Sequence, residues 1–250
     1  KVKFINLPPY DWQEHRKYIC DWMRKQEFCI DLTDNFSDGN GYLKTDLSTD
    51  GLHPDAEGKK IIGTAMMQEV ERCRLAVAEA VAGRSVAVVS SGDAGVYGMA
   101  GLVLDMVLEL PEPVEVEIVA GVSAVNAAAA ILGAPLMHDF AVISLSDLLT
   151  PWELIKRRVR MAAAGDFVIA LYNPKSRRRV ENIVEVREIL LEYREKTTPV
   201  GIVTNAGRLD ERKVISTLDS FTAEEINMFS LVLVGNSQTY VKAGFMITPR

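Results

Sequence analysis

The sequence predicts an α/β fold, in which strands and helices alternate over most of the chain. From about Gly63 onward, short apolar runs rich in β-branched residues alternate with segments of helical periodicity. These runs are continuously apolar, which is typical of a sheet covered on both faces. Several of them end in turns that contain glycine, asparagine or serine. Because open α/β sheets bind ligands beyond the carboxyl ends of their strands, we expect a ligand site there.

The expected elements follow in order. Strands are expected at 85–89, 114–119, 141–144, 167–172, 200–204 and 230–234, and helices at 67–81, 99–110, 123–132, 151–164, 180–195 and 223–228. The sequence LPEPV at 110–114 contains two prolines, which discourage helix continuation. We therefore expect a lobe over 63–113 and a second lobe over 114–250. The first 62 residues are richer in turn formers and form a separate segment.

Composition limits the class of protein. The 250 residues are 48% hydrophobic and 25% charged, and the formal net charge is −6. A negative net charge argues against a general nucleic-acid binder, and no apolar run approaches the about 20 residues of a membrane span. Three cysteines without a C-x-x-C pair, and no signal-peptide pattern, predict reduced thiols and a cytoplasmic location. The three histidines lie far apart in sequence, so we expect no metal site.

The loop 90–101, SSGDAGVYGMAG, is the most informative stretch of the chain. Its G-x-x-G-x-x-G spacing differs from the dinucleotide fingerprint and from the P-loop. Glycines at a strand end let backbone groups touch a ligand directly. Asp93 offers an acceptor where a phosphate site needs donors, which indicates a neutral or cationic ligand.

Three further strand ends carry small or polar residues. They lie in the sequences EIVAGVSAVNAAAAIL at 117–132, ALYNPKSRRR at 170–179 and GIVTNAGR at 201–208. Ser123 either caps the following helix or holds a ligand, and close helix packing also explains the alanines. Asp147 is favoured as a helix N-cap. Together, the four strand ends predict a single ligand crevice.

Six motifs, in order, resemble those of the tetrapyrrole methylases, and most of all the branch that methylates C(17) of a corrin precursor. They are GDAGVYGMAG, GVSA, LGAPLMHDF, SLSDLLTPW, YNP and NAGR, and the resemblance covers about Gly63 to the C-terminus. It implies a two-lobed α/β fold, a homodimer, and S-adenosylmethionine bound between the lobes. It also implies methyl transfer to precorrin-3B or cobalt-factor III with ring contraction in cobalamin biosynthesis. The implied cofactor contacts are Gly92, Asp93, Val96, Tyr97, Ser123, Ala124, Tyr172, Asn173, Asn205, Ala206 and Gly207.

Substrate contacts are expected among basic residues, because a corrin precursor carries many carboxylates. The segment 151–180 holds eight Lys or Arg against Glu153 and Asp166, a local charge of +6. These basic side chains either lie on solvated faces of helices and loops or form a docking surface for the carboxylates of the substrate. We take Arg177, Arg178 and Arg208 as candidates for substrate binding. His138 and Asp139 are candidates for proton transfer during ring contraction, or are structural residues.

The first segment departs from this family. The G-x-G-P-G loop with which the family begins is absent, and TDGLHPDAEGKKI at 49–61 resembles the C-terminal end of an SGNH hydrolase. That resemblance implies a catalytic pair, Asp50 and His53, whose nucleophile block is missing. We expect a methylase that has lost its first segment and carries a hydrolase tail, by fusion or by an assembly error. The alternatives are an inactive or binding-only relative and an esterase built on that pair.

Overall fold

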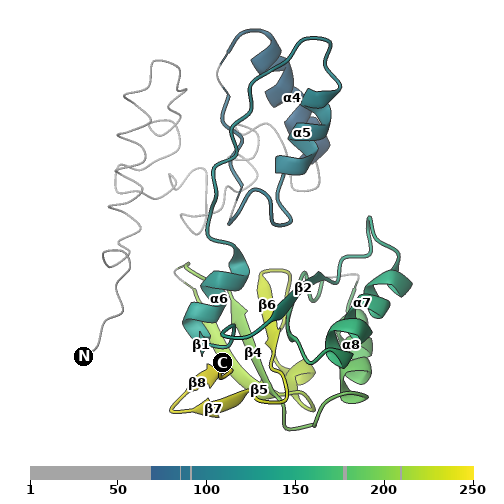
Figure 1. The fold of residues 1–250 in the computed structure, drawn as a ribbon, viewed down its shortest axis with the longest axis vertical. Helices are drawn as coiled ribbons and strands as arrows, with labels where there is room; N and C mark the ends of the chain where they lie inside the picture. The colour runs from purple at the N-terminus through teal and green to yellow at the C-terminus, as the bar shows by residue number, and fades with distance from the viewer. Residues whose placement is uncertain (1–68, 85, 91, 177–178, 209) are drawn as a thin grey trace, which may run out of the picture. The chain divides into compact units, whose positions relative to one another are not determined.

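The computed structural model describes residues 69–250 except 85, 91, 177, 178 and 209. The chain divides into two compact units, with the break between Gly121 and Val122 (Figure 1). This break lies later in the chain than the lobe boundary expected at 113/114. No helix among the described residues is long and apolar enough to cross a membrane.

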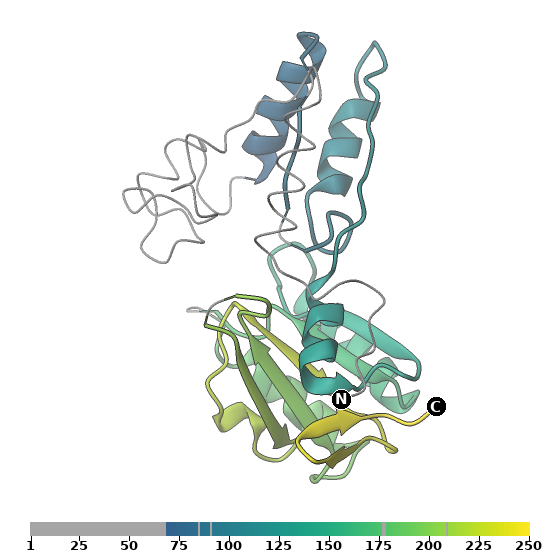
Figure 2. The ribbon, with the colours of Figure 1, turned by 90° about the vertical axis from the view of Figure 1, so that its left-hand side faces the viewer.

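The described part of the first unit contains two helices, α4 (Glu69–Val81) and α5 (Ala100–Leu108), which pack against each other (Figure 2). They confirm the helices expected at 67–81 and 99–110. The strands expected at 85–89 and 114–119 are wrong, because the described residues there have no strand pairing. Apolar side chains in both stay exposed, with Val89 at 80% and Val119 at 74%. A β-branched run becomes a strand only when a neighbouring strand takes up its backbone hydrogen bonds.

The second unit is built on a five-stranded mixed sheet in the order β2-β3-β6-β4-β5. The strands are β2 (Phe140–Ser144), β3 (Val168–Tyr172), β4 (Pro199–Thr204), β5 (Arg212–Thr217) and β6 (Ser230–Val234). β2 and β3 are parallel, and β6 runs antiparallel to both β3 and β4. Strands β2, β3 and β4 therefore end at the same edge of the sheet. We call residues 144–147, 172–176 and 204–208 at this edge the carboxyl edge.

Helices cover both faces of this sheet (Figures 1 and 2). On one face, α6 (Ala124–Leu132) packs against β4, β5 and β6, and on the other α7 (Trp152–Ala164) packs against β2, β3 and α8 (Asn182–Leu191). Alternate residues of β3 supply the two cores, with Val168 and Ala170 in the core with α6 and Ile169 and Leu171 in the core with α7 and α8. A small second sheet, β1-β8-β7, consists of β1 (Gly133–Ala134), β7 (Tyr240–Lys242) and β8 (Phe245–Ile247).

Most of the expected elements of this unit are confirmed. The strands expected near 141–144, 167–172, 200–204 and 230–234, and the helices near 123–132, 151–164 and 180–195, are present. The helix expected at 223–228 is wrong, since only one 3-10 turn, Phe221–Ala223, forms. There Asn227 Oδ1 accepts from the backbone N of Phe229, and Ser230 Oγ accepts from the backbone N of Asn227. Such side-chain bonds to the backbone compete with helix formation.

Candidate functional site

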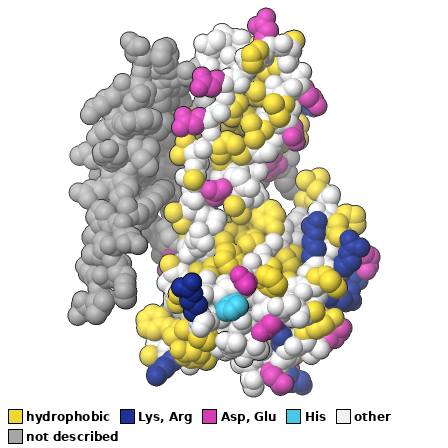
Figure 3. All heavy atoms as spheres, viewed as in Figure 1, with side chains coloured by type: hydrophobic (Ala, Val, Ile, Leu, Met, Phe, Trp, Pro, Cys, Tyr) yellow, Lys and Arg dark blue, Asp and Glu magenta, His cyan; other side chains and the backbone are white. Residues whose placement is uncertain are grey.

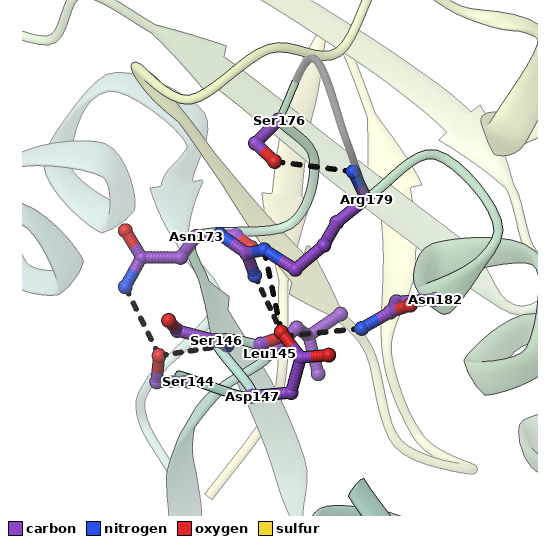
Figure 4. A network of polar contacts seen from close by, with 8 residues as sticks. All are labelled: Ser144, Leu145, Ser146, Asp147, Asn173, Ser176, Arg179 and Asn182. Carbon is purple, nitrogen blue, oxygen red and sulfur yellow. Dashed lines mark hydrogen bonds and ion pairs between the residues drawn. The ribbon is translucent and has the colours of Figure 1, made fainter. Parts of the chain in front are cut away.

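The carboxyl edge brings two of the four predicted strand ends, those in 170–179 and 201–208, together in the second unit, and adds the end of β2. At the ends of β2 and β3, Asn173 Nδ2 donates to Ser144 Oγ at 3.0 Å (Figure 4). At the end of β4, the backbone N of Asn205 donates to the carbonyl of Phe229 at 3.2 Å. Ordered polar groups therefore occupy the edge at which parallel strands of α/β proteins bind ligands.

Left-handed backbone conformations are concentrated at predicted contact residues. Among the described non-glycine residues with positive φ are Tyr97 at 54°, Asn173 at 49° and Asn205 at 54°. The other two are Asp166 and Ala243. Such conformations are disfavoured for residues that carry a Cβ, and they cluster at ligand sites in proteins. Each of the three turns follows or belongs to one of the loops that the sequence singled out.

Tyr172 links the end of β3 to the start of α6. Its hydroxyl accepts a hydrogen bond from the backbone N of Val125 at 2.9 Å, within the first helical turn. Ser123 is the N-cap residue, but its hydroxyl makes no capping bond, and the residue is only 7% exposed. The Ser123 side chain therefore does not cap α6, and the second role that the sequence allows for it, contact with a ligand, stays a prediction. Ala124 begins the helix directly after it.

In the loop that follows β4, two carboxylates accept hydrogen bonds from residues of the same loop. Asn205 Nδ2 donates to Asp210 Oδ2 at 2.6 Å, and the backbone N of Gly207 donates to Glu211 Oε2 at 2.7 Å. Ala206 lies between these two anchored residues. The guanidinium of Arg208 lies 5.6 Å from the centre of the Phe229 ring. Its Nη1 is buried and has no hydrogen-bond partner in the described part of the chain.

In the first unit, Asp93 joins two of the predicted loops. Its Oδ1 accepts from the backbone N of Gly95 at 2.8 Å, and its Oδ2 accepts from the backbone N of Gly121 at 2.9 Å. These hydrogen bonds, with that of Gly121 the strongest influence, hold the pKa of Asp93 below its usual value. Both carboxylate oxygens of Asp93 therefore accept hydrogen bonds from backbone N–H groups of the protein. The sequence predicted that this carboxylate accepts from a ligand, whereas in the structure it accepts from the two loops.

The same contact explains the glycines. A Cβ on Gly121 would lie 2.2 Å from the carbonyl oxygen of Gly92, so only glycine permits this approach of the two loops. Gly92 itself has φ 84°, a conformation that glycine adopts readily. Val96 and Tyr97 follow Asp93 in this loop and are both exposed, at 38% and 56%.

The basic residues of the segment 151–180 have different surroundings: some form ion pairs within the protein, and others are exposed. Lys156 pairs with Glu153 and Glu185 at 2.6 and 2.8 Å, which raises the pKa of the lysine. Arg157 and Arg158 are exposed on α7, and Figure 3 shows Lys and Arg side chains gathered on that side of the second unit. Asp147 does not cap a helix, because α7 begins at Trp152; it pairs with Arg179 instead.

Several candidates lie away from the carboxyl edge or outside the described residues. His138 and Asp139 precede β2, at the opposite end of that strand, and the backbone N of Asp139 donates to His138 Nδ1 at 2.8 Å. The five residues of β2 separate them from Ser144 by about 17 Å at the usual rise per residue. The fold therefore does not bring this pair to the other site residues. Arg177, Arg178, Asp50 and His53 lie outside the described residues.

The carboxyl edge supplies amides, hydroxyls and backbone groups, which are hydrogen-bonding groups suited to orienting a ligand. This donor set fits a reaction that depends on positioning two partners in line more than on acid–base catalysis. The family model described as Tetrapyrrole (Corrin/Porphyrin) Methylases matches residues 15–222. The chain belongs to this family. The match begins within the segment 1–62 that the sequence sets apart, and the boundary expected at 62/63 stays a prediction.

Individual methylases of this family are closely similar to the chain. It is 52% identical over 192 residues to a Salmonella typhimurium protein named probable cobalt-factor III C(17)-methyltransferase, covering 77% of this chain and 80% of that protein. It is 53% identical over 196 residues to the cobalt-factor III methyltransferase of Priestia megaterium, covering 77% of this chain but 36% of that longer protein. The crystal structure of the methyltransferase CobJ superposes with a TM-score of 0.71 at 38% identity, covering 79% of this chain and 80% of CobJ. The predicted α/β fold of the tetrapyrrole methylases is confirmed.

Sequence reasoning missed two residues of the methylase's carboxyl edge. Ser144 ends β2 and accepts hydrogen bonds from Asn173 and from the backbone N of Ser146. Thr204 and Ser230 share a hydrogen bond of 2.8 Å between neighbouring strands. A polar residue that closes an apolar strand is the signal that pointed to Asn173 and Asn205, and Ser144 and Thr204 carry the same signal.

Proposed function

We propose that this methylase transfers a methyl group from S-adenosylmethionine to C(17) of a corrin precursor, with ring contraction, in cobalamin biosynthesis. The observation that carries the proposal is the 52% identity to the Salmonella typhimurium relative over four-fifths of that relative's length. The geometry agrees, because left-handed Asn173 and Asn205 both lie at the carboxyl edge. The proposed macrocycle is cobalt-factor III, and the alternative is its cobalt-free counterpart, precorrin-3B.

We assign contacts to the methyl donor in each unit separately. In the first unit they are the loop residues Gly92, Asp93, Val96 and Tyr97. In the second they are Ser123, Ala124, Tyr172, Asn173, Asn205, Ala206 and Gly207. When bound, the donor supplies an electrophilic methyl on a sulfonium. The chain's own amides and backbone groups orient this ligand, and Tyr172 keeps the first turn of α6 fixed beside them.

Arg208 is the strongest candidate for binding a carboxylate. Its buried Nη1 lacks a partner among the described residues, and an unpaired buried donor is costly unless a ligand supplies an acceptor. Carboxylates occur on the macrocycle and on the amino-acid end of the donor, and Arg binds them through charge-assisted hydrogen bonds. Arg177 and Arg178 remain proposed substrate contacts on the evidence of sequence alone.

The first test is a calorimetric titration with S-adenosylhomocysteine, the demethylated product. The wild-type chain is expected to bind, and Asn205→Gly is expected to bind more weakly because it loses the carboxamide while tolerating the left-handed turn. Ala243→Gly is the matched control: Ala243 is also left-handed, at φ 50°, but lies in the turn between β7 and β8. Absence of binding by the wild-type chain at millimolar ligand overturns the proposed donor.

The second test is turnover with cobalt-factor III and with precorrin-3B, followed by mass spectrometry. The proposal predicts a product heavier by one methylene unit with at least one of the two. Binding of the donor without turnover of either would favour the binding-only alternative. The esterase alternative rests on Asp50 and His53 and predicts ester hydrolysis that His53→Ala abolishes.

The proposal includes a homodimer and a cytoplasmic location. The family resemblance suggests the first, and the three cysteines without a C-x-x-C pair suggest the second. Light scattering of the purified chain measures the assembly, and a monomer at micromolar concentration would contradict the dimer.

A further inference from the structure

One arginine next to the carboxyl edge, Arg179, contacts two strand ends at once (Figure 4). Arg179 Nη1 donates to the carbonyl oxygen of Leu145 at 2.8 Å, and it lies 3.5 Å from the carbonyl oxygen of Asn173. Leu145 directly follows β2, and Asn173 directly follows β3. The guanidinium therefore ties together the ends of two neighbouring parallel strands.

Arg179 is itself held in place. The backbone N of Ser176 donates to the carbonyl of Arg179 at 3.1 Å, and the backbone N of Arg179 donates to Ser176 Oγ at 3.2 Å. Its Nε lies 3.6 Å from Asp147 Oδ1, and its side chain is only 18% exposed. Charge-assisted hydrogen bonds are strongest where water is largely excluded. An arginine that binds a substrate carboxylate needs free guanidinium donors, whereas those of Arg179 already contact groups of the protein.

The consequence falls on Asn173, which is held from two sides. Its carbonyl faces the Arg179 guanidinium, and its side-chain Nδ2 donates to Ser144 Oγ. Asn173 adopts a left-handed φ of 49°, which asparagine tolerates better than most residues that carry a Cβ, and these contacts select that conformation. Removing the guanidinium leaves the Ser144 bond as the remaining restraint of these two.

We infer that Arg179 is a positioning residue that fixes Asn173 for the methyl donor by bridging the carbonyl oxygens of Leu145 and Asn173. The inference rests on the proposed function, and it removes Arg179 from the basic residues that would dock the macrocycle. It also gives a role to the sequence SLSD at 144–147, which Arg179 holds through Leu145 and Asp147.

The test compares the Kd of S-adenosylhomocysteine across Arg179 variants of the full chain. Arg179→Met is expected to weaken binding at least about tenfold, since it removes charge-assisted hydrogen bonds. Arg179→Lys is expected to fall between it and the wild type, because a single ammonium does not reproduce the guanidinium fork. Arg187→Met is the matched control, since Arg187 lies on α8 and bonds Thr222 and Glu188. In turnover, Arg179→Met is expected to raise the KM for the donor more than it lowers kcat.

A double-mutant cycle separates positioning from general stability. Asn173→Gly removes the carboxamide and accepts the left-handed turn. If Arg179 acts through Asn173, Arg179→Met costs less than about twofold in the Asn173→Gly background. In an Asn205→Gly background, where Arg179's partners are intact, it keeps its full cost. Equal costs in the two backgrounds overturn the inference.

The failures of the two proposals are distinguishable. Wild-type protein that does not bind S-adenosylhomocysteine overturns the proposed donor and this inference with it. Wild-type protein that binds, together with an Arg179→Met variant of equal affinity, overturns the inference alone. If Arg179→Met does not fold, Arg179→Lys carries the comparison, and wild-type affinity in that variant also overturns the inference.

Discussion

Two short apolar runs, one in each unit, differ in structure: one forms a buried strand and the other forms no strand. Residues 86–89 read VAVV and residues 231–234 read LVLV. Val232 and Val234 are fully buried in β6, between β3 and β4, whereas Val86 is 40% and Val89 80% exposed outside any strand. Figure 3 shows apolar atoms across the face of the first unit. A short apolar run therefore forms a strand where neighbouring strands complete its hydrogen bonds and other elements cover its faces.

The units also differ in what orders their predicted site residues. In the second unit, Asn173 and Asn205 sit at the ends of a buried sheet. In the first, Asp93 holds the glycine loop through bonds to backbone N–H groups rather than through a packed strand. We therefore expect stability to depend on the core of the second unit, and loop order in the first unit to depend on Asp93 and Gly121.

The largest expected effect contrasts two Leu→Ala substitutions. Leu233 is fully buried in β6, and Leu233→Ala is expected to lower the free energy of unfolding by about 2–5 kcal/mol through lost packing and a cavity. Leu108, at the end of α5, is 79% exposed, and Leu108→Ala is expected to change it by less than about 0.5 kcal/mol. Urea denaturation measures both. Equal losses of unfolding free energy in the two variants would show that Leu108 contributes as much packing as Leu233, and would contradict this comparison of the two units.

The second effect tests the loop contact in the first unit. Gly121→Ala places a Cβ against the carbonyl of Gly92, which has to move. Strain of this kind costs about 1–3 kcal/mol. Affinity for S-adenosylhomocysteine is expected to fall in calorimetry, because the Gly92–Tyr97 loop is displaced. Unchanged affinity would separate this loop from the donor site.

The third effect is a pH dependence of the same contact. Because the folded pKa of Asp93 is lowered, its stabilising bonds are fully present above the ordinary Asp value of about 3.9 and are lost as pH falls through the lowered value. NMR titration of the Gly95 and Gly121 amides is expected to report this transition below the ordinary range. Asp93→Asn is expected to abolish the transition, since a carboxamide does not titrate in this range, and its NH2 group would also face one of the two backbone donors. A titration at the ordinary value would contradict the contact.

The smallest effect is stabilising. Gly101 lies inside α5, and a Cβ there meets nothing within 4 Å. Gly101→Ala is expected to raise the free energy of unfolding by about 0.5–1 kcal/mol, because alanine loses less backbone freedom in a helix. Thermal unfolding measures the change. A loss of stability would mean that another surface approaches this position.

Particular residues show how far the sequence predicts the fold and the site. The runs at 167–172 and 230–234 are predicted as strands because they are largely apolar, and they form the buried strands β3 and β6. β5 was missed: it begins with Arg212 and Lys213, and it lies at the sheet's edge, where one side needs no partner. Ser144 and Arg179 were not predicted to meet Asn173, because 29 and 6 residues separate them along the chain.

By itself, the sequence determined the helices α4 to α8, the buried strands of the second unit, the glycine, asparagine and serine turns that follow them, and the methylase family. Local periodicity and turn chemistry are properties of neighbouring residues, so they can be read from the chain. Only the tertiary structure decided which apolar runs pair, that β2, β3 and β4 end at one edge, and that Arg179 braces Asn173 there. Those outcomes depend on contacts between distant segments, in which a strand exists only with its partner and a charged side chain takes its role from the groups it faces.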